Sequence, residues 1–107
     1  MNLIQHYDAE SDLEFEIPEF DPSEYEEVAE FLAAHEAEVN EAILSALHGA
    51  VEFELQWAPT FAIRGTEEVF GIHRSEFAGQ AERLTEYYSA LEEYELCIVL
   101  QEIKTKL

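Results

Sequence analysis

Basic side chains are nearly missing from this sequence, and the first of them, Arg64, comes after more than half of the chain. The protein has 5 Lys and Arg against 25 Asp and Glu, which gives a formal net charge of −20. A small domain needs a net charge of only about 2 to 8 for solubility. Because repulsion among the surplus carboxylates destabilises the folded state, the charge points to a function that uses it.

Cysteine is also scarce, since Cys97 is the only one. This excludes an intramolecular disulfide and a zinc site built from cysteine pairs. Cys97 lies in the apolar run LCIVL, where we expect a buried, unreactive thiol. No apolar run reaches the roughly 18 residues of a membrane span, and MNLIQHYDAE lacks the basic and apolar regions of a signal peptide. We therefore expect a soluble, cytoplasmic protein that does not bind membranes or nucleic acids directly.

The sequence lacks the motifs of catalysis and of cofactor binding. It contains no G-x-S-x-G, no P-loop and no dinucleotide fingerprint. His35 and Glu36 begin an HExxH pattern, but Val39 stands where zinc binding needs the second histidine. We therefore expect no enzymatic activity and no cofactor.

A calcium site is the metal site closest to a match. The spacing of four carboxylates fits the ligand positions of an EF-hand loop: Asp8, Glu10, Asp12 and Glu19. However, Leu13 stands where such a loop needs glycine, and the residues that follow alternate as in a strand. In a sequence so rich in carboxylates, this match is expected by chance, and we predict no metal.

Hydrophobic periodicity predicts two helices separated by strands. The first helix spans residues 23–48, with a possible break near 35–37 and a stop at Gly49. The second helix follows Ser75 as its cap and presents an apolar stripe made of Phe77, Ala81, Leu84, Tyr88 and Leu91. Alternating or apolar runs predict strands at residues 12–17, 51–57, 60–65, 68–74 and 94–103, the third and fourth of these forming one or two strands around Gly65.

The predicted class is α+β, a single acidic domain of residues 1–107 with a small antiparallel sheet and two helices. Its order, β-α-β-β-α-β, is that of the split βαβ or ferredoxin-like fold. Two features disagree with that topology. The first helix would be about 39 Å long, and the last strand, apolar on both faces, suits a central rather than an edge position.

Carboxylates gather in the half of the sequence that has no basic residue. If both early strands turn their apolar residues inward, four glutamates share the outer face of the sheet: Glu14, Glu16, Glu52 and Glu54. Four more lie beside the apolar stripe of the first helix: Glu24, Glu26, Glu27 and Glu30. Like charges one helical turn apart repel each other by a few tenths of a kcal/mol. These eight glutamates are the predicted partner-binding residues.

Such a surface suits a basic protein partner. In size and charge the chain resembles the acidic DNA-mimic inhibitors that phages use against host defences, although the resemblance is one of composition and covers no motif. It implies an inhibitor that blocks the basic groove of a nuclease, restriction enzyme or CRISPR effector. Imitating DNA requires that the carboxylates lie on one side, because duplex DNA offers roughly 100 Å² per charge.

Three alternatives remain open. An immunity protein or antitoxin would use the same acidity to plug a basic toxin, with hydrophobic anchors contributing more of the affinity. An acidic assembly or chaperone-like subunit would form a stable oligomer, and a homodimer is compatible with the sequence. The charge can also serve solubility or life in high salt, although 22 Glu against 3 Asp fits a halophile poorly.

Overall fold

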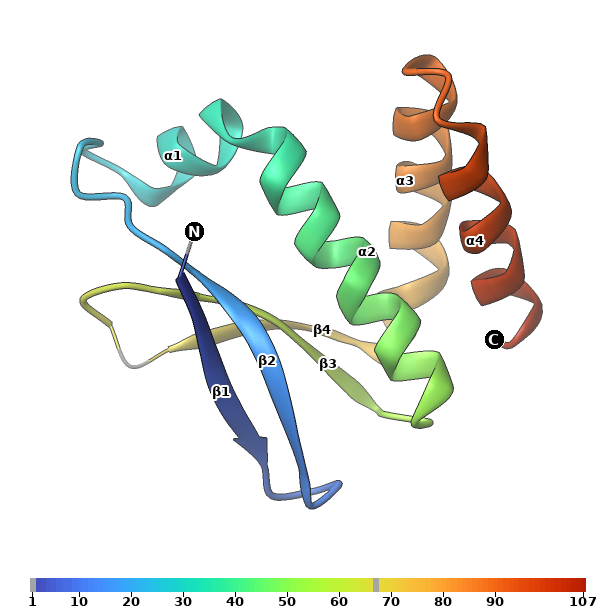
Figure 1. Cartoon of the computed structure of the whole chain (residues 1–107), viewed down its shortest axis with the longest axis horizontal. Helices are drawn as coiled ribbons and strands as arrows, with labels where there is room; N and C mark the ends of the chain where they lie inside the picture. Colours follow the sequence, from blue (N-terminus) through green and yellow to red (C-terminus); the bar gives the residue numbers. More distant parts are fainter. Residues whose placement is uncertain (1, 67) are drawn as a thin grey trace.

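The structure is a computed structural model that describes residues 2–66 and 68–107 (Figure 1). It is a mixed α+β fold whose elements follow the order ββααββαα. The strands are β1 (Asn2–Asp8), β2 (Leu13–Phe20), β3 (Trp57–Ile63) and β4 (Val69–His73). The α-helices are α1 (Val28–Ala34), α2 (Glu36–Glu52), α3 (Phe77–Ala90) and α4 (Tyr94–Thr105), with a short 3-10 helix at Arg74–Glu76.

The four strands form one sheet in the order β1-β2-β3-β4, and the helices gather along one side of it (Figure 1). The β1–β2 and β3–β4 pairs are antiparallel hairpins. Between them, β2 and β3 run parallel and pair only at Glu19↔Ala62 and Phe20↔Ile63. The sheet is therefore mixed, and the prediction of an antiparallel sheet was wrong at this junction. The reason is that α1 and α2 form a crossover, which returns the chain in its original direction.

The segment predicted as a last strand, residues 94–103, is instead the helix α4. Its Leu100 and Ile103 are buried in the core, and α4 packs against α3 and α2. A short run that is apolar on all sides fits a buried strand and a helix equally well by periodicity. The helix adjoins α3, so the described residues form four α-helices instead of two, and their order is not the ferredoxin-like one.

The strand predicted at residues 51–57 is mostly the end of α2 and a turn. Gly49 does not stop α2, which continues to Glu52, and the Phe53 N–H still donates to the Gly49 carbonyl at 3.0 Å. Leu47 and Ala50 are fully buried, and this packing holds the last turns in helical form. Glu54 then adopts a left-handed backbone (φ 55°), and the strand begins only at Trp57.

The long first helix is two helices, and the predicted break near residues 35–37 is confirmed. His35 separates α1 from α2 with φ −115° and ψ 38°, and its ring stacks on that of Phe31 at 4.4 Å. The start of the helix was predicted too early. Asp21 accepts a hydrogen bond from the Ser23 N–H in a local turn, and the helix begins only at Val28.

The other predicted elements are present with small changes. Residues 60–65 contain the end of β3 and a turn where Gly65 has φ 90°, and residues 68–74 contain the whole of β4. The α3 stripe is buried except for Leu91, which is 56% exposed, and Glu76 rather than Ser75 takes the N-cap position. The strand β1 has no counterpart in the prediction, because its exposed Leu3 and Tyr7 obscure the alternation.

Two hydrophobic clusters hold the fold together. The larger one joins α2, α3, α4 and the start of the β3–β4 hairpin around buried residues such as Leu47, Phe77 and Leu84. The smaller one joins α1, the start of α2 and the junction of β2 with β3, with Phe20, Phe31 and Phe61 in contact. The second cluster fixes α1 and its carboxylates to the end of the sheet.

Candidate functional site

All eight glutamates of the predicted surface are exposed to solvent. Within residues 2–66 and 68–107, none of the eight takes part in an ion pair. Basic residues are engaged elsewhere: Arg64 pairs with Asp21 at 3.7 Å, and Lys104 with Glu82 at 2.7 Å. Arg74 and Arg83 donate to the Leu55 carbonyl and the Asn40 side chain. The negative charge of the eight therefore stays uncompensated by these cations.

The structure separates these glutamates into groups. The first, named here the α1 group, consists of Glu24, Glu26 and Glu27 before α1 and Glu30 in its first turn. Phe20 and Phe31 are buried and Tyr25 is half-buried. The Phe31 ring packs against the rings of both Phe20 and Tyr25, so these aromatic residues anchor the group to the fold.

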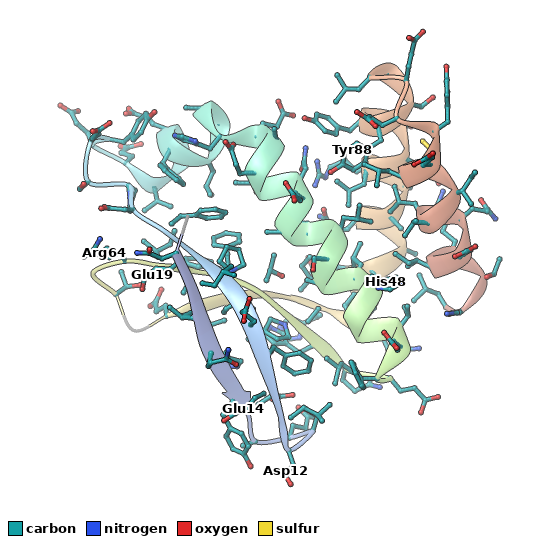
Figure 2. All side chains as sticks on the ribbon, viewed as in Figure 1. Asp12, Glu14, Glu19, His48, Arg64 and Tyr88 are labelled. Carbon is teal, nitrogen blue, oxygen red and sulfur yellow. The ribbon has the colours of Figure 1, made fainter. Side chains whose placement is uncertain are left out.

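The second group lies where the tip of the β1–β2 hairpin meets the end of α2. Glu52 and Glu54 do not share a sheet face with Glu14 and Glu16 as predicted, because their segment is a helix end and a turn. Glu54 and Glu10 instead line one cavity of about 340 Å³ beside the hairpin tip. Figure 2 places Glu14 near this tip as well.

Glu16 belongs to neither group. It faces a groove between β2 and α2, where Glu38 and Glu41 also line the wall. The sequence places these two helix residues off the apolar stripe of α2, but hydrophobic periodicity does not predict which strand lies opposite them. Their position on the same groove as Glu16 depends on how α2 crosses β2, which is a property of the tertiary fold (Figure 1).

The carboxylates at the hairpin tip are held by hydroxyl groups. The Tyr7 hydroxyl donates to Asp12 at 2.5 Å, and the Ser11 hydroxyl donates to Asp8 at 2.7 Å. The hydrogen bond to Asp12 raises the pKa of Tyr7, because the carboxylate favours the protonated phenol. In the part of the chain that the structure describes, no three His, Cys, Asp or Glu side chains are placed to hold a metal ion.

Asp21 follows the other end of β2 and pairs with Arg64. Figure 2 places Arg64 near Glu19. The backbone N–H and the hydroxyl of Ser23 lower the pKa of Asp21, and the Arg64 guanidinium lowers it further. Asp21 is thus ionised but has a cationic neighbour, unlike the α1 group that follows it.

Comparisons with protein-family models, with curated proteins and with solved structures gave no match for this chain. Among the residues described, no helix combines the length and the apolar character needed to cross a bilayer.

Proposed function

We propose that this protein is a small acidic inhibitor that occupies the basic groove of a nucleic-acid-binding enzyme in place of the nucleic acid. The partner would be a nuclease, a restriction enzyme or a CRISPR effector in the same cytoplasm. The protein would act by binding, without catalysis, a cofactor or direct contact with nucleic acid. The observation that supports this most is the set of eight exposed glutamates that form no ion pair with the described cations.

Charge density decides where such mimicry is feasible. The surface area of 6832 Å² and the net charge of −20 correspond to about 340 Å² per charge, against roughly 100 Å² for duplex DNA. An evenly charged molecule would be about threefold too dilute. The contact must therefore use the places where carboxylates are concentrated and cations are missing.

The α1 group has a spacing suited to this role. Its four carboxylates lie within the stretch 24–30, which spans roughly 10 Å if helical and 25 Å if extended. The charges are then about 3 to 8 Å apart along the chain, a range that includes the roughly 3.4 Å of helix axis per phosphate of one DNA strand. Lys and Arg of a target could neutralise these carboxylates as they neutralise phosphates.

The binding would be driven by charge. Lys and Arg in a nucleic-acid groove hold exchangeable anions at low salt, and displacing these ions favours association. Long-range attraction between the −20 protein and a basic groove would also speed the encounter, and added salt would weaken both effects. A steep loss of affinity with rising salt is therefore the first property expected of the complex.

The test is competition with DNA. The immobilised protein is exposed to a lysate, and the retained proteins are challenged with short duplex DNA and with salt. We expect duplex DNA to displace the target at a concentration near the dissociation constant of the complex between that DNA and the target. The proposal is contradicted if the target stays bound at saturating DNA, or if its affinity does not change with the salt concentration.

Two variants of equal charge locate the contact. One changes the α1 group to glutamine, namely Glu24, Glu26, Glu27 and Glu30. The other removes the same charge from α3, α4 and the N-cap of α4, by changing Glu86, Glu93, Glu95 and Glu102 to glutamine; all four are exposed. We expect the first variant to lose inhibition and the second to retain most of it. Equal losses would mean that only net charge matters.

An immunity protein or antitoxin is the second candidate, because an apolar side chain lies within the acidic surface. Phe53 is 52% exposed between Glu52 and Glu54. In a toxin-specific plug, Phe53 would be a hot spot. The Phe53→Ala change would then cost at least tenfold in affinity, and the salt dependence would be shallow. A DNA mimic should show the opposite pair of results.

An acidic assembly subunit is a further proposal, and a homodimer would accompany it. Tyr94 and Ile98 leave an apolar strip on the outer side of α4. A dimer that persists at micromolar concentration and ignores basic proteins would favour this function over inhibition.

A further inference from the structure

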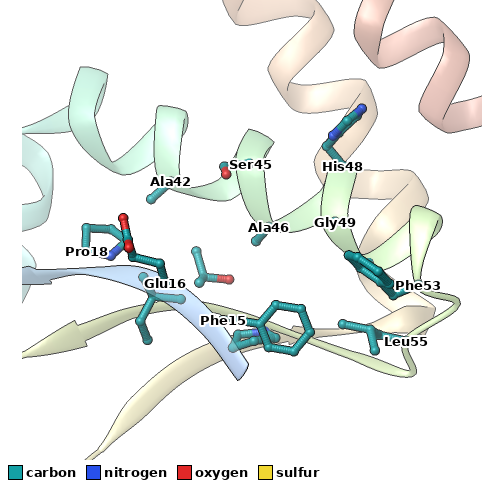
Figure 3. Close-up of a pocket in the computed structure, with 14 residues that line it drawn as sticks. Phe15, Glu16, Pro18, Ala42, Ser45, Ala46, His48, Gly49, Phe53 and Leu55 are labelled. Carbon is teal, nitrogen blue, oxygen red and sulfur yellow. The ribbon is translucent and has the colours of Figure 1, made fainter. Parts of the chain in front are cut away.

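A groove runs between β2 and α2 (Figure 3). Two adjoining cavities form it, each of about 240 Å³, and they share four lining residues: Glu16, Pro18, Ala42 and Ser45. Phe15, Phe53 and Leu55 form an apolar wall at one end, and Leu3 lines the other end. The groove therefore has apolar side chains at both ends, and acidic residues stand where it opens to solvent.

The space exists because neither side fills it. On α2, the positions that face β2 hold small residues, among them Ala42, Ala46 and Gly49. A Cβ added to Gly49 would meet no atom within 4 Å, so packing does not require glycine there. Glycine inside a helix is unfavourable relative to alanine. On the other side, β2 pairs with β3 only through its last two residues, so the rest of the β1–β2 hairpin is not tied to β3.

The charged groups beside the groove are carboxylates. Glu16 and Glu41 line it and take part in no ion pair within the described residues, while Glu38 lies 3.7 Å from His35. The polar contact of Glu16 is a long hydrogen bond from the Gln5 amide, at 3.4 Å. No Lys or Arg is among the described residues that line the two cavities. His48 lines the groove too, but its ring is directed to the other side of α2 (Figure 3).

We propose that this groove binds the side chain of an arginine or lysine supplied by the basic partner. This inference rests on the proposed function and deepens it by identifying what the partner inserts. The aliphatic stem would lie against Phe15, Ala46 and Gly49. Its cationic group would reach Glu16 and Glu41.

The choice of ligand follows from the two parts of the groove. Long basic side chains combine an apolar stem with a charged end, and this is the division that the groove offers. A neutral apolar side chain would displace water from around the Glu16 carboxylate without supplying a positive charge. An acidic side chain would be repelled. A guanidinium also donates several hydrogen bonds to carboxylates, which makes arginine the better fit.

The experiment uses n-alkylguanidinium ions as probes, from methyl to hexyl, titrated into the isotope-labelled protein and followed by NMR. We expect the affinity to rise about fourfold for each added methylene until the groove is filled. The amide signals of Ala46 and Gly49 should shift the most. Affinity that does not depend on chain length, or shifts spread evenly over the acidic residues, would overturn the proposal.

Variants separate the two parts of the site. Ala46→Leu should abolish the dependence on chain length while leaving weak guanidinium binding. Glu16→Gln combined with Glu41→Gln should weaken every probe and preserve the dependence on chain length. If Ala46→Leu fails to fold, Gly49→Ala replaces it, because its new methyl group meets no atom. We expect it to stop the rise in affinity about one methylene earlier, and an unchanged profile would overturn the site.

The outcomes also distinguish this groove from the proposed function. If wild-type protein shows no dependence on chain length but still captures a target that DNA displaces, only the groove is rejected. If the probes bind as expected but no DNA-displaceable target exists, the inhibitor function fails and the groove remains a binding site for alkyl cations.

Discussion

The indole of Trp57 lies directly against the backbone of Gly71 on the adjacent strand, so that a Cβ added to Gly71 would come within 2.2 Å of the ring. The same indole meets the ring of His6 edge-on, with 6.0 Å between the centroids. Trp57 thus joins the β1–β2 hairpin to the β3–β4 hairpin in a region where β2 and β3 do not pair. The absence of a side chain at Gly71 allows this contact.

Gly71→Ala should therefore destabilise the protein by about 1 to 3 kcal/mol, the range for a methyl group forced into a packed site. Urea unfolding measures the loss. Gly79→Ala in α3 is the matched control, because a Cβ there meets no atom within 4 Å. This control should gain up to about 1 kcal/mol. If both variants have wild-type stability, the contact with Trp57 is not constrained as described.

Asn40 and Arg83 form a polar contact between α2 and α3. Asn40 is 2% exposed, and its Oδ1 accepts a hydrogen bond from Arg83 at 3.0 Å, whereas its Nδ2 has no partner among the described residues. Arg83→Ala should cost about 1 to 3 kcal/mol, because it leaves the buried Asn40 oxygen unpaired too.

Asn40→Leu should be neutral or stabilising by about 1 kcal/mol, since it removes the buried amide and Arg83 can return to water. Chemical denaturation of both single variants and of the double variant measures the difference. A larger loss for Asn40→Leu than for Arg83→Ala would show that the Asn40 amide makes a further stabilising contact.

Tyr88 should make the folded protein less stable at alkaline pH. Burial raises the pKa of Tyr88 above the ordinary value of 10.0, with smaller contributions from Tyr87 and Glu41 that Arg83 partly offsets. The folded protein holds this proton more tightly than the unfolded chain. The stabilisation is therefore complete below pH 10 and is lost as the pH rises through the folded pKa.

Tyr88→Phe should remove that part of the alkaline loss while leaving the stability at neutral pH nearly unchanged. The melting temperature measured from pH 8 to pH 11 tests this. Tyr94→Phe serves as the control, because Tyr94 is 61% exposed. Identical alkaline profiles for wild type and Tyr88→Phe would exclude Tyr88 as the responsible group.

Elements with one buried face could be predicted from the sequence. In β2, Leu13, Phe15 and Ile17 alternate with exposed glutamates because only one face meets the core, and the stripe of α3 is visible for the same reason. The segment of α4 could not be assigned, because Ile98 is apolar yet 61% exposed. The apolar pattern then no longer distinguishes buried positions from exposed ones. The sequence therefore does not reveal that this segment packs against α3 as a helix.

The candidate surface was predictable in its exposure but not in its arrangement. Charged side chains are seldom buried without a partner, so the eight glutamates were expected at the surface. Their grouping depends on a left-handed residue at Glu54 and on a helix that continues past Gly49. Neither event has a local signal, since glycine usually favours the opposite outcome at a helix end.

Repulsion within the α1 group should be measurable as a gain in stability when the group is neutralised. Changing Glu24, Glu26, Glu27 and Glu30 together to glutamine keeps their size and their exposure. The variant should melt at a higher temperature than wild type at low ionic strength, by an amount equivalent to several tenths of a kcal/mol. The difference should shrink in about 1 M salt, where the screening length is only about 3 Å.

The variant in which Glu86, Glu93, Glu95 and Glu102 become glutamine is the control for this measurement. It lowers the net charge equally, but these carboxylates lie in the half of the chain that contains Arg64 and every later basic residue. We expect a smaller gain, because nearby cations already offset part of the repulsion. If both variants gain equally and salt closes both gaps, the repulsion is a property of the whole molecule. The measurement would then give no reason to prefer the α1 group over the other carboxylates as the contact with a basic partner.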